Sequence, residues 1–168
     1  VDFVYARVNA EYDNFMRGNC WIAYTWHTGI NDPGQQSSDP DAPNPYCDRS
    51  GGRPAGEPED FAMLKVKKDF TISDNVDAYL VAEYSYTGDI VLDASNDPYA
   101  VQDHYNLLNL RFFMNFASYD MDVIFWGRNV LDEEYINHVN FNTPLQEGKM
   151  NAYVSDPATF GITVRKRF

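Results

Sequence analysis

Apolar and polar residues alternate along several separate stretches of the chain. In residues 76–87 the even-numbered positions are apolar from Val76 to Tyr86, whereas the odd-numbered positions include Asp77 and Glu83. A period of two residues places alternate side chains on opposite faces of a β-strand. In residues 1–12 the even-numbered positions from 4 to 10 are likewise mostly apolar. The pattern predicts an all-β fold with six strands, in segments 1–12, 61–70, 76–87, 105–117, 121–130 and 158–168.

The connections between these segments alternate in length. Residues 71–75 and 118–120 are short and rich in Ser, Asp and Asn, which suits tight turns. The other three connections are long: residues 13–58, 88–104 and 131–157. In an up-and-down antiparallel sheet this order puts every long loop at one end, as in transmembrane β-barrels of the bacterial outer membrane. A soluble β-sandwich or lipocalin-like barrel is the alternative, although such folds rarely carry loops of this length at one end only.

Composition is compatible with this interpretation. Aromatic residues make up 15 % of the chain, and aromatic rings pack well on a pleated surface. No apolar run approaches the roughly 18 residues of a transmembrane helix, but strands cross a membrane with only alternate residues facing lipid. The net charge of −12 argues against a nucleic-acid partner, because phosphate binding needs concentrated Lys and Arg. The simplest explanation of the excess of acidic residues is that they keep the protein soluble. The alternative is that acidic loops attract cations.

Candidate catalytic and metal-binding groups are sparse. His27, His104 and His138 fall in or beside long connections without the spacing of a metal motif. The aspartates between residues 32 and 48 lack the regular spacing of a calcium loop, so solvated loop residues are the favoured interpretation of both groups. No nucleophile with a neighbouring His and acid can be placed, and no paired catalytic carboxylates or glycine-rich phosphate loop is present. The sequence therefore predicts a protein that is not an enzyme and has no cofactor or metal.

Two stretches near the C-terminal end resemble a known family. The segment WGRNVLDEEYI, residues 126–136, is similar to the W-x-x-N-L-x-D-x-x-Y segment of TonB-dependent outer-membrane receptors, and its match is carried by Trp126, Asn129, Asp132 and Tyr135. The segment DPATFGITVRKRF, residues 156–168, resembles the closing strand of that family. A proline, an aromatic–glycine pair and a terminal Arg-Phe recur there, and in this chain they are Pro157, Phe160–Gly161 and Arg167–Phe168.

The resemblance implies a fold, a location and a function. The whole receptor would be a 22-stranded transmembrane barrel occluded by a plug domain, and this chain would supply the C-terminal six strands without the plug. The long loops would be extracellular and the C-terminus periplasmic. Implied partners are outer-membrane lipid and lipopolysaccharide, the remainder of the barrel and plug, TonB, and the barrel-assembly machinery. The implied function is energised uptake of a scarce, bulky nutrient such as a ferric siderophore, haem, cobalamin or an oligosaccharide. A passive porin, a barrel enzyme or a soluble β-barrel binding protein are the alternatives.

In such a barrel the polar and apolar faces of the strands would have different roles. The polar faces of the third and fourth strands would line the lumen, through Tyr79, Glu83, Asn109, Arg111 and Asn115. The opposite faces would contact lipid, through Ala78, Leu80, Ala82, Leu108, Leu110, Phe112 and Phe116. Four aromatic residues of the long loops are candidates for stacking on a ring-bearing ligand: Trp26, Tyr46, Tyr99 and Tyr153.

The closing strand and the two cysteines complete the expected features. Phe160, Ile162, Val164 and Phe168 are expected to face lipid in one register and to act as an assembly signal, with the outer edge of their strand unpaired within this chain. Lys166 departs from the family pattern, but its ammonium can reach water from near the interface. The loop bearing Cys20 and CDRSGGRP looks like a Cys-paired external loop of the family, so Cys20 and Cys47 are expected to form a disulfide. Two unpaired thiols are the alternative, and a metal pair is disfavoured.

Overall fold

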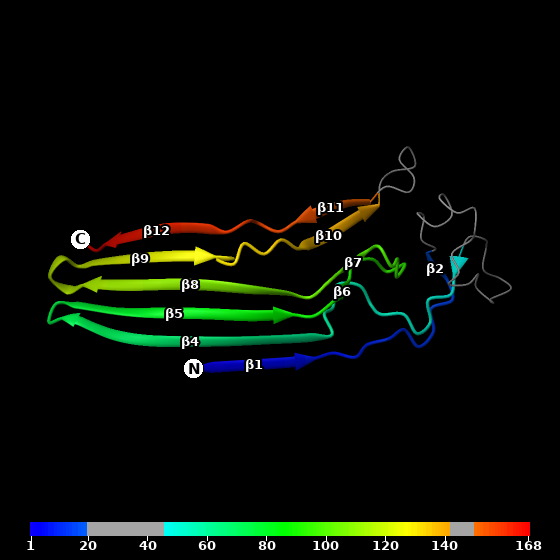
Figure 1. Cartoon of the computed structure of the whole chain (residues 1–168), viewed down its shortest axis with the longest axis horizontal. Helices are drawn as coiled ribbons and strands as arrows, with labels where there is room; N and C mark the ends of the chain where they lie inside the picture. The colour runs from blue at the N-terminus through cyan, green and yellow to red at the C-terminus, as the bar shows by residue number, and fades with distance from the viewer. Residues whose placement is uncertain (20–45, 142–149) are drawn as a thin grey trace.

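The computed structural model describes residues 1–19, 46–141 and 150–168. Six strands form one sheet, shown in Figure 1. In spatial order they are β1 (Asp2–Arg7), β4 (Asp60–Ser73), β5 (Val76–Thr87), β8 (Tyr105–Phe116), β9 (Met121–Arg128) and β12 (Thr159–Lys166). Every neighbouring pair is antiparallel, which confirms the predicted all-β antiparallel fold. The sheet is open, because β1 and β12 each have a single neighbour among the described strands.

Several strand ends differ from the sequence-based expectation. β1 ends at Arg7 rather than at residue 12, because the chain then leaves the regular ladder. β4 continues to Ser73, opposite Val76, so that only residues 74 and 75 form the turn. β8 leads into a short 3₁₀ turn, η1 (Ala117–Tyr119), which is closed by Asp120 with a φ of 46°. Side-chain alternation alone marks none of these ends.

The three long connections contain short strands that the alternation of the sequence does not predict. The first holds β2 (Gly18–Asn19) and β3 (Tyr46–Cys47), the second β6 (Ile90–Val91) and β7 (Val101–Gln102), and the third β10 (Ile136–Phe141) and β11 (Met150–Val154). Figure 1 shows these additional strands at one end of the main sheet and the two tight turns at the other. The predicted asymmetry of the connections is therefore present in the fold.

The first long connection extends the pairing of β1 with β4 in an irregular form. The backbone N–H of Val8 donates to the carbonyl of Glu59 at 2.9 Å, and that of Arg49 donates to the carbonyl of Phe15 at 2.8 Å. Farther along, β2 pairs with β3. The two sides of this connection therefore stay paired, with interruptions, from the end of the main sheet as far as Asn19 and Tyr46.

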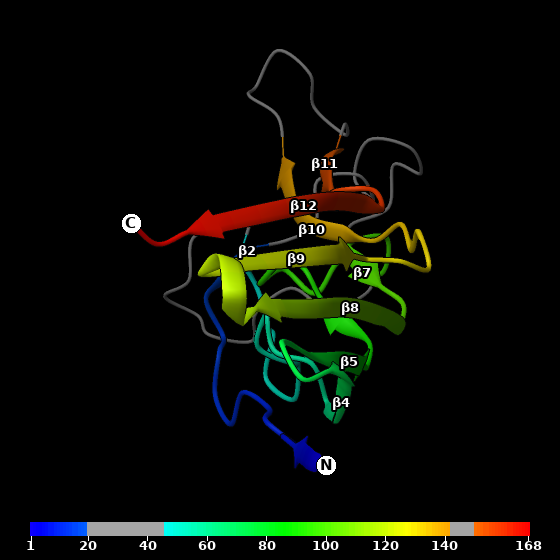
Figure 2. The same cartoon turned by 90° about the vertical axis from the view of Figure 1, so that its left-hand side faces the viewer.

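One face of the six-stranded sheet is mainly apolar. The register places Leu80 beside Phe112, Phe112 beside Phe125, and Phe125 beside Ile162. The residues expected to contact lipid all lie on this face: Ala78, Leu80, Ala82, Leu108, Leu110, Phe112 and Phe116. Within the described residues no helix or second sheet covers the face, as the two views in Figures 1 and 2 show. Large apolar side chains on it are therefore exposed, with 63 % of Ile162 accessible.

The sheet lacks the enclosed core of a soluble β-sandwich in the part of the chain described. Among its six strands, Ala78 is the only apolar residue that is fully buried. The other buried apolar residues, Cys47, Val91, Ala100 and Val139, belong to the additional strands or the segments next to them. No described helix is long and apolar enough to cross a membrane.

Two glycines of the main sheet lie against aromatic rings where β9 pairs with β12. Gly127 is opposite Phe160, and Gly161 is opposite Trp126. A Cβ added to Gly127 would lie 2.9 Å from Cδ1 of Phe160, and one added to Gly161 would lie 2.6 Å from Cε2 of Trp126. Each strand therefore supplies one ring and one glycine, and each ring occupies the space that the opposite glycine leaves. This reciprocal arrangement accounts for the Phe160–Gly161 pair noted in the sequence, and for Trp126–Gly127 on the neighbouring strand.

We expect Gly161→Ala to lower the free energy of unfolding by about 1–3 kcal/mol, because the added methyl group overlaps the Trp126 ring. The measurement is denaturant unfolding of the refolded protein. Combining Gly161→Ala with Trp126→Leu removes the obstructing ring, so the loss caused by Gly161→Ala should be smaller in that background. An equal loss in both backgrounds would show that the ring is not the cause.

Candidate functional site

A cavity of about 620 Å³ lies on the polar face of the sheet, midway along the strands. Its lining comes from β4, β5, β8, β9 and β12, since alternate residues of each strand point to this side. Four of the five residues predicted to line a lumen are in its wall: Tyr79, Glu83, Asn109 and Arg111. The fifth, Asn115, is on the same face but outside the cavity, where its Nδ2 donates to Oδ1 of Asp122 at 2.7 Å.

Aromatic rings form part of the cavity wall. Tyr79 and Phe113 are cross-strand neighbours whose rings stack with centroids 4.6 Å apart and planes inclined by 15°. Trp126 is fixed by a hydrogen bond from its indole N–H to Oγ1 of Thr163 at 3.3 Å. The guanidinium of Arg128 lies 5.5 Å from the Trp126 ring centroid, within the range of a cation–π interaction. The wall therefore offers flat apolar surfaces beside cationic groups.

The charges around the cavity are mainly positive. Four cationic side chains line it, namely Lys65, Arg111, Arg128 and Arg165, whereas Glu83 is its single carboxylate. Lys65 and Glu83 are directly opposite in the register, but neither forms an ion pair with any described residue. This concentration of cations contrasts with the net charge of −12 for the whole chain.

Three of these cations were missed by sequence reasoning. Lys65, Arg128 and Arg165 come from segments whose polar faces were not assigned to a lumen. Alternation alone places Arg128 on the same face as Trp126, and Arg165 on the same face as Thr163. That they line the same cavity as Arg111 depends on how the strands are aligned, which the sequence pattern does not specify.

The aromatic loop candidates do not form one site in the described residues. Tyr99 is 74 % exposed in the connection between β6 and β7, and Tyr153 is 58 % exposed on β11. The Tyr153 ring lies 6.0 Å from that of His138, and no described ring contact joins it to Tyr99. Trp26 and the side chain of Tyr46 lie outside the described residues. A stacking role for these four residues remains a prediction.

The motif residue Asn129 ties the chain leaving β9 to the chain entering β12. Its Nδ2 donates to the carbonyls of Glu133 at 2.8 Å and Asp156 at 3.1 Å, and its Oδ1 accepts the N–H of Glu133 at 3.0 Å. Its φ of 47° is in the left-handed region, which Asn adopts more readily than most residues. Asn129 therefore has a structural role at the junction between β9 and β12.

Two further motif residues act at the same junction. Oδ1 of Asp132 accepts the N–H of Ala158 at 2.8 Å, just before β12 begins. The ring of Tyr135 stacks on that of Tyr105, with centroids 4.0 Å apart and planes inclined by 6°. Burial raises the pKa of the Tyr135 phenol above its usual value, and the nearby Tyr105 and Asp156 act in the same direction. The phenol therefore stays neutral at physiological pH.

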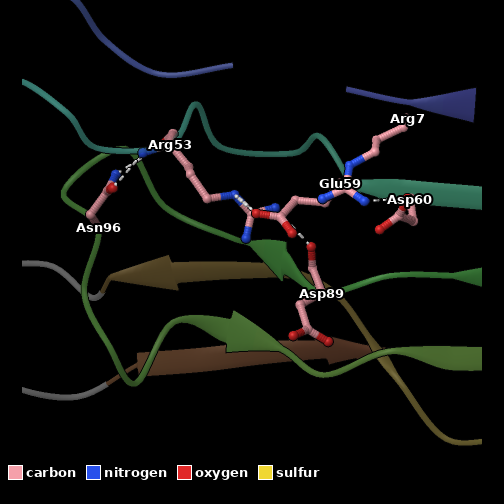
Figure 3. Close-up of polar contacts among 6 residues, drawn as sticks. All are labelled: Arg7, Arg53, Glu59, Asp60, Asp89 and Asn96. Carbon is pink, nitrogen blue, oxygen red and sulfur yellow. Dashed lines mark hydrogen bonds and ion pairs between the residues drawn. The ribbon is translucent and has the colours of Figure 1, made fainter. Parts of the chain in front are cut away.

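Polar contacts also join the first two long connections, as Figure 3 shows. Arg53 and Asn96 exchange hydrogen bonds, from the Arg53 N–H to Oδ1 at 2.9 Å and from Nδ2 to the Arg53 carbonyl at 3.0 Å. The Arg53 guanidinium lies 3.5 Å from Glu59 and donates to the carbonyl of Asp89 at 3.0 Å. These contacts hold the first and second long connections together at this end of the sheet.

The histidines are separately placed. His104 lies beside Asp89, with Nδ1 and Oδ1 3.5 Å apart, and His138 lies beside Tyr153. His27 is outside the described residues. Within the part of the chain that is described, no three His, Cys, Asp or Glu side chains are grouped so that they could hold a metal ion.

Three residues of the expected assembly signal lie on β12, and the fourth lies beyond its end. Phe160, Ile162 and Val164 alternate on the apolar face and are largely exposed. Phe168 lies beyond the end of β12 at Lys166 and is fully exposed, so the expectation that the strand continues through it is wrong. The last backbone bond to the neighbouring segment is from the Arg167 N–H to the Asp120 carbonyl at 3.0 Å. Lys166 turns back to donate to the carbonyl of Tyr119.

The described cysteine is oxidised. Cys47 is 2 % exposed and disulfide-bonded, which places an oxidised thiol in the first long connection. Cys20, its predicted partner, lies outside the described residues.

Comparison with known proteins gives no match. No family model, curated protein or solved structure is significantly similar to this chain.

Proposed function

We propose that this chain forms part of the wall of a transmembrane β-barrel in the bacterial outer membrane, belonging to a TonB-dependent receptor that takes up a scarce, bulky nutrient. The observation that carries the proposal is the division of the sheet into two faces. One face is mainly apolar, with Lys68 of β4 among its few charged residues, and is uncovered in the described residues, and the other holds a polar cavity. Lipid on the first face and an aqueous lumen on the second match these surfaces.

The arrangement of the connections supports the same proposal. All three long connections extend from one end of the sheet, and the two tight turns lie at the other (Figure 1). Outer-membrane barrels have long extracellular loops and short periplasmic turns. The long connections would then face the outside of the cell, and oxidation of Cys47 is in keeping with that compartment.

The open edges of the sheet require further strands under this proposal. An unpaired edge in lipid would leave backbone donors and acceptors without partners, at several kcal/mol each. β1 and β12 would therefore pair with other segments of a closed barrel, which the family resemblance puts at 22 strands. Trp126, Asn129, Asp132 and Tyr135 carry that resemblance, and it is the basis for choosing energised uptake over passive diffusion.

The test is nutrient uptake by a strain that lacks this protein. We expect the deletion to abolish growth on one class of scarce nutrient, among ferric siderophores, haem, cobalamin and oligosaccharides, and expression of the intact receptor to restore it. The same growth should be lost when TonB is deleted. Growth on a small nutrient that diffuses through general porins serves as the control. Uptake through the restored protein that persists without TonB would contradict the energised mechanism and indicate a passive porin.

A further inference from the structure

We propose that Lys68 and the apolar hollow beside it bind one anionic phospholipid, with the lipid phosphate on the ammonium group and an acyl chain in the hollow. The inference rests on the proposed membrane position of the sheet and adds a specific lipid to it. It does not depend on what the protein transports.

Lys68 is an isolated cation on the mainly apolar face of the main sheet. Among the six strands this face carries three other charged residues, and all of them are at strand ends: Arg7 ends β1, Asp60 begins β4 and Lys166 ends β12. Lys68 is instead in the interior of β4, directly opposite Leu80 of β5. Its neighbours along the same face of β4 are Val66 and Phe70, so apolar side chains surround it.

The charged residues at the strand ends have polar partners, whereas Lys68 has none among the described residues. The Asp60 carboxylate lies 4.0 Å from the Arg7 guanidinium. Lys166 donates to the carbonyl of Tyr119. The Lys68 ammonium forms no ion pair or hydrogen bond within the described part of the chain. A charge in apolar surroundings is costly unless an opposite charge compensates it, so its counter-ion must come from outside these strands.

The depth of Lys68 selects the leaflet that supplies this counter-ion. β4 ends at Ser73, beside a tight turn. At about 3.4 Å per residue and a strand tilt of about 40°, Lys68 is about 13 Å from that end along the bilayer normal. The flexible stem of a lysine directs its ammonium toward the nearer interface, and a lipid phosphate drawn toward it closes the remaining distance. Lys68 therefore binds headgroups of the leaflet on the side of the tight turns.

The hollow provides the apolar half of the site. Its volume of about 500 Å³ is in the range of small-molecule sites, and Leu80, the cross-strand neighbour of Lys68, is part of its wall. Further wall residues come from β8, β9 and β12: Leu110, Phe112, Phe125, Phe160 and Ile162. None of its described lining residues is charged. Because the cation and the hollow adjoin at Leu80, the phosphate and one chain of a single lipid can occupy both.

The charge of the site favours an anionic phospholipid over a zwitterionic one. A lysine ammonium donates charge-assisted hydrogen bonds to phosphate oxygens. Phosphatidylcholine also carries a quaternary ammonium close to its phosphate, which Lys68 would repel. Phosphatidylglycerol carries the same phosphate without this second cation, so it is the better match for Lys68.

The experiment is native mass spectrometry of the intact receptor, purified in a neutral detergent and titrated with lipid. We expect dimyristoyl phosphatidylglycerol to occupy one site about tenfold more tightly than dimyristoyl phosphatidylcholine. Lys68→Gln should weaken this site about tenfold, which is the usual effect of losing one charge-assisted hydrogen bond. Dihexanoyl phosphatidylglycerol, with the same headgroup and shorter chains, should bind more weakly than the dimyristoyl lipid because it buries less apolar surface in the hollow.

Two variants serve as controls. Lys67→Gln removes the adjacent cation, which is on the opposite face of β4 and lies 2.7 Å from Asp69, so it should leave the lipid affinity unchanged. Lys68→Arg keeps the charge at the same position and should retain the preference for phosphatidylglycerol. Far-UV circular dichroism checks that each variant is folded, and the comparison of the two headgroups on the wild-type receptor needs no variant.

Three outcomes would overturn the lipid site: equal affinities of the wild type for the two dimyristoyl lipids, equal losses in Lys67→Gln and Lys68→Gln, or equal affinities for the long- and short-chain phosphatidylglycerols. The first two would show that the Lys68 ammonium does not select the headgroup, and the third that the hollow holds no chain. A receptor that stayed soluble and monodisperse without detergent would instead contradict the membrane position itself. The failure of the lipid site and that of the proposed function are therefore distinguishable.

Discussion

Replacing Leu110 with arginine is expected to lower the free energy of unfolding in a lipid bilayer by about 2–4 kcal/mol. Leu110 lies near the middle of β8, on the apolar face, between Ala82 of β5 and Gly127 of β9. Under the proposed membrane position, the guanidinium at this depth could not reach water without deforming the bilayer. The measurement is urea unfolding of the protein refolded into lipid vesicles.

The same strand offers a matched control. Leu107 lies on the opposite face of β8, beside Ser85, and is half-buried like Leu110. Leu107→Arg should cost much less, because the polar face would be hydrated. Leu108→Arg, on the apolar face but nearer the end of the strand, should give an intermediate loss, since the cost decreases toward the interface. Equal losses for Leu107→Arg and Leu110→Arg would show that lipid does not contact the apolar face.

Replacing Asn129 with alanine is expected to lower the free energy of unfolding by about 2–4 kcal/mol. The substitution removes three hydrogen bonds made by a side chain that is 8 % exposed, and leaves the carbonyl of Glu133 with one donor fewer. Alanine also adopts the φ of 47° less readily than asparagine does. Denaturant unfolding of the refolded protein measures the loss.

Two further variants separate these causes. Asn129→Gly loses the same hydrogen bonds but tolerates a positive φ, so it should be about 1 kcal/mol more stable than Asn129→Ala. Asn137→Ala, at an exposed position with one long hydrogen bond of 3.4 Å, should change stability by less than about 0.5 kcal/mol. If Asn129→Ala resembled Asn137→Ala in stability, the junction would not depend on the Asn129 side chain.

The periodicity of the sequence predicted the main sheet well where both faces of a strand differ clearly. β5 spans the residues expected from alternation, because all its even-numbered positions are apolar, its odd-numbered positions are mostly polar, and Gly88 follows its end. Alternation also predicted the polar faces of β5 and β8, and four of the residues assigned to them line the cavity. Such predictions need only the two-residue repeat of a strand, which is a local property of the chain.

The features that the sequence did not predict depend on non-local pairing. In residues 1–12 the even-numbered residues are the more uniformly apolar set, but Phe3 pairs with Leu64, so the odd-numbered residues of β1 join the apolar face of the sheet. The short strands β2, β3, β6 and β7 have two residues each, which is too few for a periodic pattern to be detected. That Lys65 and Arg165 both line the same cavity likewise follows from the alignment of five strands.

The pairing within the first long connection also sets the conformational entropy that is lost when this connection closes into a loop. When Val8 meets Glu59, residues 9–58 form the closed segment, and when Asn19 meets Tyr46, only residues 20–45 do. Closure entropy grows with the logarithm of length, so halving the segment changes the cost by only about 0.6 kcal/mol. Doubling the length of residues 20–45 would add a similarly small amount. The main sheet therefore imposes almost no constraint on how long this segment is.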